Sequence, residues 1–279
     1  MIYIVIPVHN RIEKTIKCLN SIYMQNENDI QIVVVDDGSN DGTKQILQEE
    51  YPRITLLTGT GSLFWTGAVH YGINYILTIC DKDDWVLLVN NDVQLGINTV
   101  NELVKFSETH DKKVIVNALS VDSKDKDTII KSGTIVKSWF FNWTHHVFHN
   151  YKLVDLESKK EVEVDLLTGR CLLHPVEIFM EIGNYNSKIL PHYGGDDEFT
   201  ARAKLFGFKL FILPSAIVYL DQDNVYKNKE SIFQAMFSMN SSTNVVYRWR
   251  LTRRIVPLYA QPSYYIITII KSIIHYLKK

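Results

Sequence analysis

Cysteine is scarce in this sequence, and its few residues are scattered. Cys18, Cys80 and Cys171 are the three cysteines among 279 residues, and no two of them form a C-x-x-C pair. An odd number of separated cysteines excludes a disulfide framework and a cysteine-based zinc site, and it is typical of a reducing compartment. We therefore expect a cytoplasmic protein.

Long apolar runs and a net charge of either sign are missing as well. No stretch approaches the roughly 20 apolar residues of a membrane-spanning helix, and the first residues predict a strand rather than a signal peptide. The 30 basic and 31 acidic side chains give a formal net charge of −1, which argues against nucleic acid as a partner. With 46% hydrophobic residues, the chain is too apolar to be disordered.

Over the first 120 residues, short apolar runs alternate with helical patterns. Such alternation predicts an α/β fold, in which a doubly wound sheet is built with right-handed crossovers. Ligands bind such sheets at the carboxyl ends of the strands, so candidate site residues are sought there. We expect strands at residues 2–8, 31–35, 54–57, 85–89 and 114–118, and helices at residues 12–23, 43–51, 65–77 and 98–108.

After residue 120 the pattern loosens, with no internal repeat and no linker that would mark a boundary. We therefore expect one continuous domain over residues 1–225, with a nucleotide-binding half at residues 1–120. In its second part we expect strands at residues 128–136 and 161–167 on either side of an aromatic, histidine-rich segment at 139–149, helices at 175–182 and 196–206, and a strand at 208–213.

Acidic and amide side chains directly follow the second and the fourth expected strand. Asp36 and Asp37 stand where a carboxylate can accept hydrogen bonds from a ribose hydroxyl or a base N–H, although Asp-Gly-Ser is also an ordinary turn and helix cap. Asn90, Asn91 and Asp92 stand where a carboxylate can anchor a divalent cation that neutralises a pyrophosphate. The alternative there is again a turn rich in Asn and Asp.

A third acidic cluster opens the helix expected at 196–206. Asp196, Asp197 and Glu198 follow two glycines, and at least one of them fits simple stabilisation of the helix dipole. Three acids in a row exceed what a cap requires, and a carboxylate there can act as a general base towards a hydroxyl. The cluster His145, His146 and His149 fits a surface aromatic loop better than a metal site. Trp65, Trp139 and Trp143 fit core packing better than sugar stacking.

Taken in order, these motifs resemble the family-two glycosyltransferases of the GT-A fold, over about residues 1–215. Two further segments resemble a bacterial rhamnosyltransferase-like subgroup that builds surface polysaccharides: residues 61–68, and Gly169-Arg170 together with His192-Tyr193-Gly194. The segments that carry the family resemblance are Pro7-Val8-His9-Asn10, residues 34–43, Leu87-Leu88-Val89-Asn90-Asn91-Asp92, and Gly195-Asp196-Asp197-Glu198-Phe199 with Arg202 and Gly207.

The resemblance implies a Rossmann-like mixed sheet in a single domain, with residues 121–225 as an acceptor half and residues 226–279 as a C-terminal helical extension. It implies a UDP- or dTDP-sugar donor and a glycan or lipid-linked acceptor. The implied nucleotide-binding residues are Pro7, His9, Asn10, Asp36, Asp37, Gly61, Ser62 and Trp65. The implied donor-sugar residues are Asn90, Asn91, Gly169 and Arg170, the implied ligand of Mn²⁺ or Mg²⁺ is Asp92, and the implied catalytic residues are Asp196 and Asp197.

The chain departs from the family pattern at three places. Asn90 stands where the first metal-site aspartate is usual, so ionic metal binding is left mainly to Asp92. Gly195 replaces the usual glutamate before the base, so the base is either Asp196 or Asp197. Many relatives supply a downstream histidine to the metal, but residues 217–224 contain none; Asp221, Asp223 and water are the alternatives.

The implied reaction is a single inverting displacement at the anomeric carbon of the donor sugar. A nicotinamide dehydrogenase would need G-x-G-x-x-G after the first strand, and residues 7–11 offer none. A non-catalytic module that binds a sugar nucleotide or a glycan would keep the fold without turnover, so it remains the alternative function.

The C-terminal segment, residues 226–279, differs in composition from the rest. No acidic residue follows Glu230, while arginines and lysines accumulate. Two interpretations stay open: peripheral attachment to the inner face of the membrane, for which basic side chains and an apolar helix face are suited, or packing on the chain's own domain or on a second subunit. The apolar stripe on its last helix consists of Ile266, Ile267, Ile269, Ile270, Ile273, Ile274 and Leu277.

Overall fold

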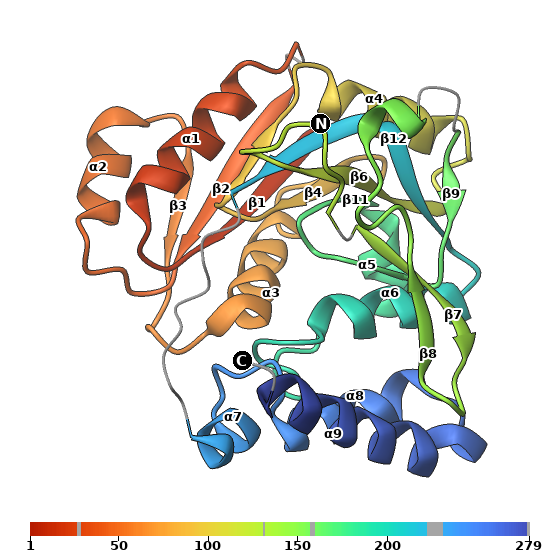
Figure 1. Ribbon diagram of the computed structural model, residues 1–279. Helices are drawn as coiled ribbons and strands as arrows, with labels where there is room; N and C mark the ends of the chain where they lie inside the picture. The colour runs from red at the N-terminus through yellow and green to blue at the C-terminus, as the bar shows by residue number, and fades with distance from the viewer. Residues whose placement is uncertain (27–28, 131, 157–159, 222–230, 278–279) are drawn as a thin grey trace.

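A computed structural model describes residues 1–26, 29–130, 132–156, 160–221 and 231–277 (Figure 1). Its strands are β1 (Ile2–Val8), β2 (Ile30–Asp36), β3 (Thr55–Thr58), β4 (Trp85–Val89), β5 (Val93–Leu95), β6 (Val114–Asp122), β7 (Gly133–Ser138), β8 (Trp143–His146), β9 (Val162–Glu163), β10 (Leu166–Leu167), β11 (Cys171–Pro175) and β12 (Lys209–Leu220). Its α-helices are α1 (Ile12–Tyr23), α2 (Thr43–Glu50), α3 (Phe64–Ile76), α4 (Thr99–Glu108), α5 (Glu177–Ile182), α6 (Gly195–Leu205), α7 (Ile232–Phe237), α8 (Val245–Ile255) and α9 (Gln261–Leu277).

The large sheet is mixed, with strand order β3-β2-β1-β4-β11-β6-β12-β5, and β9 pairs with β12. β1 runs parallel to β2 and to β4, whereas β11 enters antiparallel between β4 and β6. The doubly wound α/β sheet expected from the first 120 residues is confirmed.

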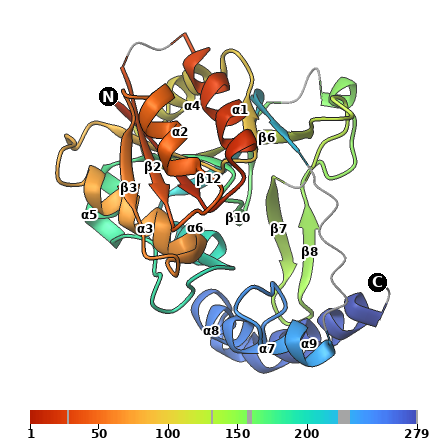
Figure 2. The same ribbon diagram turned by 90° about the vertical axis from the view of Figure 1, so that its left-hand side faces the viewer.

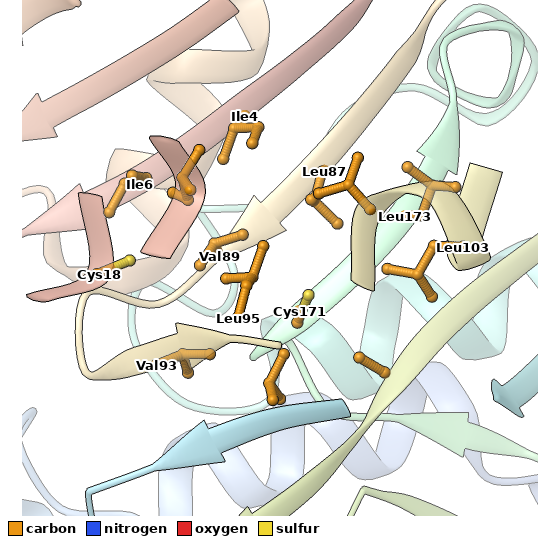
Figure 3. Packing of buried hydrophobic residues seen from close by; sticks show 14 of the residues in the cluster. Ile4, Ile6, Cys18, Leu87, Val89, Val93, Leu95, Leu103, Cys171 and Leu173 are labelled. Atoms are coloured by element: carbon orange, nitrogen blue, oxygen red, sulfur yellow. The ribbon is translucent and has the colours of Figure 1, made fainter. Parts of the chain in front are cut away.

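The sheet is buried on both faces, which explains why its central strands read as continuous apolar runs. Along β1, Ile4 and Ile6 face one layer of helices, while Tyr3 and Val5 face the other. The first layer contains α1, α2 and α4, and Figure 3 shows Cys18 of α1 near Ile6 of β1 and Leu103 of α4 near Leu173 of β11. α3, α5 and α6 cover the opposite face.

Within the first 120 residues, β5 was not expected, and beyond residue 120 several boundaries differ from the expectation. The strand expected at 128–136 is β7, which begins at Gly133 and pairs with β8 and β10 in a second, smaller sheet. The strand expected at 161–167 is divided: β9 pairs with β12 of the large sheet, and β10 with β7. The division has a local cause, because Val164 N–H donates to Leu210 on one sheet while Asp165 accepts from Val136 N–H on the other.

The C-terminal helices lie beyond α6 and against the tip of the β7–β8 hairpin (Figures 1 and 2). Asn142 Nδ2 donates to Thr268 Oγ1 at 2.8 Å, and the rings of Trp139 and Tyr264 lie 5.8 Å apart. α9 therefore packs on the chain's own domain. Among the residues that the structure describes, no helix combines the length and apolar character that crossing a bilayer requires. The expected boundary at 225–226 and the side chain of Leu277 lie outside the described residues.

His174 on β11 gives a testable pH dependence of stability. It is fully buried, donates from Nδ1 to the carbonyl of Val86, and accepts from the Tyr185 hydroxyl. Burial lowers the pKa of His174 from 6.5 to about 4, so its contribution to stability is present above pH 6.5 and is lost as the pH falls towards 4. We expect the wild type to lose ~3 kcal/mol of unfolding free energy over this range from this group.

The measurement is urea denaturation between pH 7 and pH 4.5. The variant His174→Gln, which stays neutral, should show a smaller fall with pH than the wild type. An equal fall in the two proteins would contradict the assignment to His174.

Candidate active site at the carboxyl edge of the sheet

Asp37, just after β2, organises the loop that follows β3. Its Oδ1 accepts from Gly61 N–H at 2.7 Å and its Oδ2 accepts from Phe64 N–H at 3.0 Å. The side chain is buried, and His9 Nδ1 donates to the Asp37 carbonyl at 2.7 Å. Both carboxylate oxygens of Asp37 therefore fix the backbone of residues 61–64, which places the first turn of α3 relative to β1 and β2.

Asp36 and Asn10 tie the neighbouring loops together. Asp36 Oδ1 accepts from Ser39 N–H at 3.0 Å, and Ser39 Oγ accepts from Asn10 N–H at 2.7 Å. Asn10 in turn accepts from Asn40 N–H at 2.9 Å through its Oδ1. Pro7 lies opposite Val35 in the parallel register of β1 and β2. The loops after β1 and β2 thus form one connected surface.

Glycine is required where the loop after β2 meets the loop after β3. A Cβ on Gly38 would come within 2.8 Å of Gly61 Cα, and both residues have positive φ. Ser62, next to Gly61, has its hydroxyl 2.9 Å from that of Thr60 at the same loop. The expected nucleotide-binding residues of β1, β2 and residues 61–62 are therefore brought together.

Trp65 joins this loop to the end of β4 and to the start of β11. Its Nε1 donates to Asn90 Oδ1 at 2.8 Å, and a Cβ on Gly169 would lie 2.5 Å from its ring. Asn90 N–H donates to the Arg170 carbonyl at 3.0 Å. Asn91 lies beside these groups in sequence, but its side chain donates to Thr15 of α1. Trp65, Asn90, Gly169 and Arg170 are thus neighbours.

Asp196 stands at the first turn of α6, against the same group. Its Oδ2 accepts from Gly169 N–H and its Oδ1 from Asp197 N–H, each at 3.0 Å. A Cβ on Gly195 would meet Thr66 Oγ1 at 2.4 Å. The glycine that departs from the family pattern therefore permits a close approach of α6 to the start of α3.

Glu198, the third acid of this cluster, points away from the group around Asp196 and Gly169. It is buried and makes a two-point ion pair with Arg202, with Nε–Oε1 and Nη2–Oε2 distances of 3.1 Å. Arg202 also donates to the carbonyls of Ile182 and Asn184. The Glu198–Arg202 pair therefore fastens α6 to the loop after α5, and Glu198 has a structural role.

Asp92 lies in an unusual environment for a carboxylate. Its Oδ1 is buried and, within the described part of the chain, has no hydrogen-bond partner, while Oδ2 lies 3.7 Å from Arg11 Nη1. Burial raises the pKa of Asp92, and Arg11, Lys14 and Arg170 oppose this by attraction. The orphaned oxygen marks Asp92 as an acceptor whose partner is not supplied by the described residues.

Asp221 is the second carboxylate near Asp92. The two line one small cavity of about 10 Å³ together with Lys14, and Lys14 Nζ lies 3.4 Å from Asp221 Oδ2. Asp223, the other alternative ligand, lies outside the described residues. Over the described ranges, no three His, Cys, Asp or Glu side chains gather closely enough to hold a metal alone. The donor set fits a hard divalent ion held by one or two carboxylates and completed by substrate phosphate oxygens.

Arg170 connects the candidate metal ligand to the candidate base. Burial lowers its pKa, while the nearby carboxylates of Asp92 and Asp196 raise it. Both acids are therefore close enough to this one guanidinium to interact electrostatically with it. Asp37, through residues 61–64 and Trp65, belongs to the same set of contacts. The three acidic stretches thus converge on one edge of the sheet.

The remaining candidates lie elsewhere or have other partners. Trp143 and the histidines of the aromatic segment belong to β8 and its following turn, so the expected loop is a hairpin strand. The rings of His146 and His149 are 6.3 Å apart.

Sequence reasoning missed Thr66, which is buried and donates to the carbonyls of Pro191 and His192. Its partners are 125 residues or more away, so no local pattern signals them.

Asp37 generates a stability prediction with a matched control one residue away. Asn at position 37 can accept only one of the two N–H bonds, so Asp37→Asn should lower the free energy of unfolding by about 1–3 kcal/mol. Asp36→Asn keeps an oxygen for Ser39 N–H, the partner that the described residues give to Asp36 Oδ1, and should cost less. Thermal unfolding, with limited proteolysis of residues 59–64, measures both effects. Equal stability of the two variants would remove the proposed role of Asp37.

Solved structures share this fold at low sequence identity. GalNAc-T7, crystallised with UDP, GalNAc and Mn²⁺, superposes with a TM-score of 0.69 at 17% identity, covering 90% of this chain and 48% of that chain. Residues 1–349 of TarS from S. aureus in complex with UDP give 0.56 at 16% identity, covering 100% and 72%. The mannosyltransferase PcManGT from Pyrobaculum calidifontis, with GDP-Man and Mn²⁺, gives 0.56 at 18%, covering 98% and 69%. The GT-A fold is therefore confirmed.

Curated relatives and a family model agree with this fold. An N-acetylglucosaminyl-diphospho-decaprenol L-rhamnosyltransferase of Mycobacterium tuberculosis is 26% identical over 72% of this chain and 69% of its own. Glycosyltransferase GlyG of Streptococcus pneumoniae is 22% identical over 88% and 77%. The model of "Glycosyl transferase family 2" matches residues 3–163, which is more than half of the chain. This protein therefore belongs to glycosyl transferase family 2 and is a sugar-transferring enzyme of the GT-A fold.

Proposed function

We propose that the protein moves a sugar from a UDP- or dTDP-sugar to a hydroxyl of a glycan or lipid-linked acceptor, in a metal-dependent, inverting reaction of surface polysaccharide synthesis. The observation that carries the proposal is the Gly169-Arg170 junction: Gly169 N–H donates to Asp196, and the Arg170 carbonyl accepts from Asn90 N–H, two residues before Asp92. The relatives support the substrate classes: one is named for transfer to a diphospho-decaprenol acceptor, and two neighbours hold a nucleotide and Mn²⁺.

The nucleotide is assigned to the surface built by the loops after β1, β2 and β3. This surface is held rigid by Asp37 and by the Asn10–Ser39–Asp36 contacts, so it can bind a ligand without first paying the entropy of ordering its loops. The donor sugar is assigned beside Asn90, Asn91, Gly169 and Arg170. The half-buried guanidinium of Arg170 is suited to anionic donor oxygens, since arginine pairs with phosphate through two parallel N–H bonds.

Mn²⁺ or Mg²⁺ is assigned to Asp92, with Asp221 as the second carboxylate in the same cavity. When bound, such an ion neutralises negative charge on the departing nucleoside diphosphate. Asp92 supplies the ligand oxygen, and Arg11 and Lys14 add positive charge near it. Cytoplasmic location, with peripheral membrane contact or self-association through the C-terminal segment, stays a prediction.

Asp196 is assigned as the base. In the inverting displacement the acceptor oxygen forms the new bond to the anomeric carbon as the bond to the diphosphate oxygen breaks, and Asp196 takes the acceptor proton. Asp196 contacts Gly169 and interacts with Arg170, whereas Asp197 acts electrostatically on Tyr264 of α9. Proximity to the donor residues therefore favours Asp196 over Asp197.

Substitution of the two aspartates tests this assignment. Asp196→Asn should lower kcat by ~10²–10⁴-fold with little change in nucleotide binding, because the amide keeps the oxygen that Gly169 N–H donates to. Asp197→Asn is the matched control and should keep most activity. Release of nucleoside diphosphate from a panel of nucleotide sugars, with acceptor and Mn²⁺ present, is the assay. Wild-type turnover by Asp196→Asn would refute the role, and donor binding without any release by the wild type would favour a non-catalytic module.

Removal of the metal ligand gives an independent test. Asp92→Ala should abolish transfer and weaken Mn²⁺ binding in the presence of nucleoside diphosphate, because the ion loses its main protein carboxylate. Gln94→Ala alters the same cavity without removing a charge and serves as the control. Paramagnetic resonance of Mn²⁺ reports binding, and chelation by EDTA should silence the wild type. Full activity of Asp92→Ala, or of the wild type in EDTA, would overturn the metal assignment.

A further inference from the structure

A basic cavity lies beside the candidate active site and is used by none of the roles above. It has a volume of about 660 Å³ and is lined by Lys188, Ile189, Arg250, Arg253 and Arg254. Cavities of roughly 300–1,000 Å³ are typical of small-molecule sites. Because four of its five lining side chains are cations, the cavity favours an anionic ligand.

The arginines reach the cavity from one face of α8. Residues 250, 253 and 254 stand at i, i+3 and i+4, which places their side chains together on the helix surface. Arg250 Nη1 also donates to the Ile189 carbonyl at 3.2 Å, so α8 is joined to the loop that carries Lys188. The cavity is thus built by two segments that are about 60 residues apart in sequence and are fixed to each other by a hydrogen bond.

The four cations lack local counter-charges. In the part of the chain that the structure describes, no carboxylate lies within 4 Å of Lys188, Arg250, Arg253 or Arg254. Other surface lysines of this protein, such as Lys152 and Lys204, are ion-paired. All four cations are exposed, and phosphate oxygens would bind them through charge-assisted hydrogen bonds with arginine.

The cavity adjoins the candidate base. Leu251, next to Arg250, packs where a Cβ on Gly194 would lie, at 3.0 Å, and Gly194 precedes Asp196 by two residues. Pro191 and His192, on the same loop as Lys188, accept hydrogen bonds from Thr66 beside Trp65. Figure 1 shows α8 directly beyond α6. One short loop therefore borders both the basic cavity and the proposed donor site.

We propose that this cavity binds the phosphate or diphosphate group of the acceptor. The inference rests on the proposed function, because it assigns the anion to the second substrate. The nucleotide and metal candidates, Asp37, Asn90 and Asp92, do not line the cavity, so the donor diphosphate has a different place. An acceptor anchored there would present its sugar hydroxyl towards Asp196 across the loop 188–194.

The first experiment measures anion binding without turnover. Inorganic pyrophosphate is titrated calorimetrically into the full chain in EDTA, with no donor present. Arg253→Gln/Arg254→Gln should bind it at least about tenfold more weakly than wild type, while Arg253→Lys/Arg254→Lys recovers much of the affinity. Lys82→Gln/Lys105→Gln removes the same charge at exposed positions away from the cavity and should bind as the wild type does.

The second experiment separates this site from catalysis and from a membrane contact. Hydrolysis of nucleotide sugar without acceptor should be unchanged in Arg253→Gln/Arg254→Gln. Unchanged pyrophosphate affinity in that variant overturns the proposal. If the variant instead loses binding to phosphatidylglycerol vesicles while its pyrophosphate binding stays intact, the proposal is also overturned, because the cavity would then be a membrane-facing surface. A wild type that releases no nucleoside diphosphate refutes the proposed function, but the titration still decides the anion site, because it needs no turnover.

Discussion

β11 enters the large sheet antiparallel between β4 and β6, and its first residue, Cys171, lies opposite Val89, the last residue of β4. This pairing carries Gly169 and Arg170 to the carboxyl end of β4, where Asn90 N–H bonds the Arg170 carbonyl. Gly169 N–H is then in place to donate to Asp196, and its missing side chain makes room for Trp65. The antiparallel strand therefore joins the parallel half of the sheet to the first turn of α6.

The acidic residues at this edge divide into two kinds by their hydrogen-bond partners. Asp37 and Glu198 are buried, and both carboxylate oxygens of each hold the fold together. Those of Asp37 accept from loop N–H groups, and those of Glu198 accept from Arg202. Asp92 keeps a buried oxygen that no described group satisfies, and burial raises its pKa despite three nearby cations. An unsatisfied buried acceptor is costly to keep, so its retention fits a residue whose partner arrives with the substrate.

The loop between α5 and α6 couples the two substrate regions that we propose. Arg202 holds its start through the carbonyls of Ile182 and Asn184, and Thr66 holds its end through Pro191 and His192. Between these fixed points, Ile189 accepts from Arg250 of α8. The C-terminal helices are therefore connected to the loop beside the candidate site through a hydrogen bond from an arginine side chain to the loop backbone.

The sequence alone determined most of the first 120 residues of the fold, because parallel strands buried on both faces must be apolar runs and their crossover helices must be amphipathic. The short strand β5 was not expected, because it pairs antiparallel with β12, which is more than 100 residues away. The sequence also identified the polar residues at the strand ends, since such sheets leave their functional groups there. β11 was not recognisable: residues 171–175 form a short run beside an expected helix, and antiparallel insertion between distant strands leaves no local pattern. The division of residues 161–167 between two sheets was not recognisable either, because the partners of Val164 and Asp165, Leu210 and Val136, are far away in the sequence. Only the tertiary structure decided which acids serve the fold and which face the site, because that depends on N–H groups and cations supplied by segments far away in the chain.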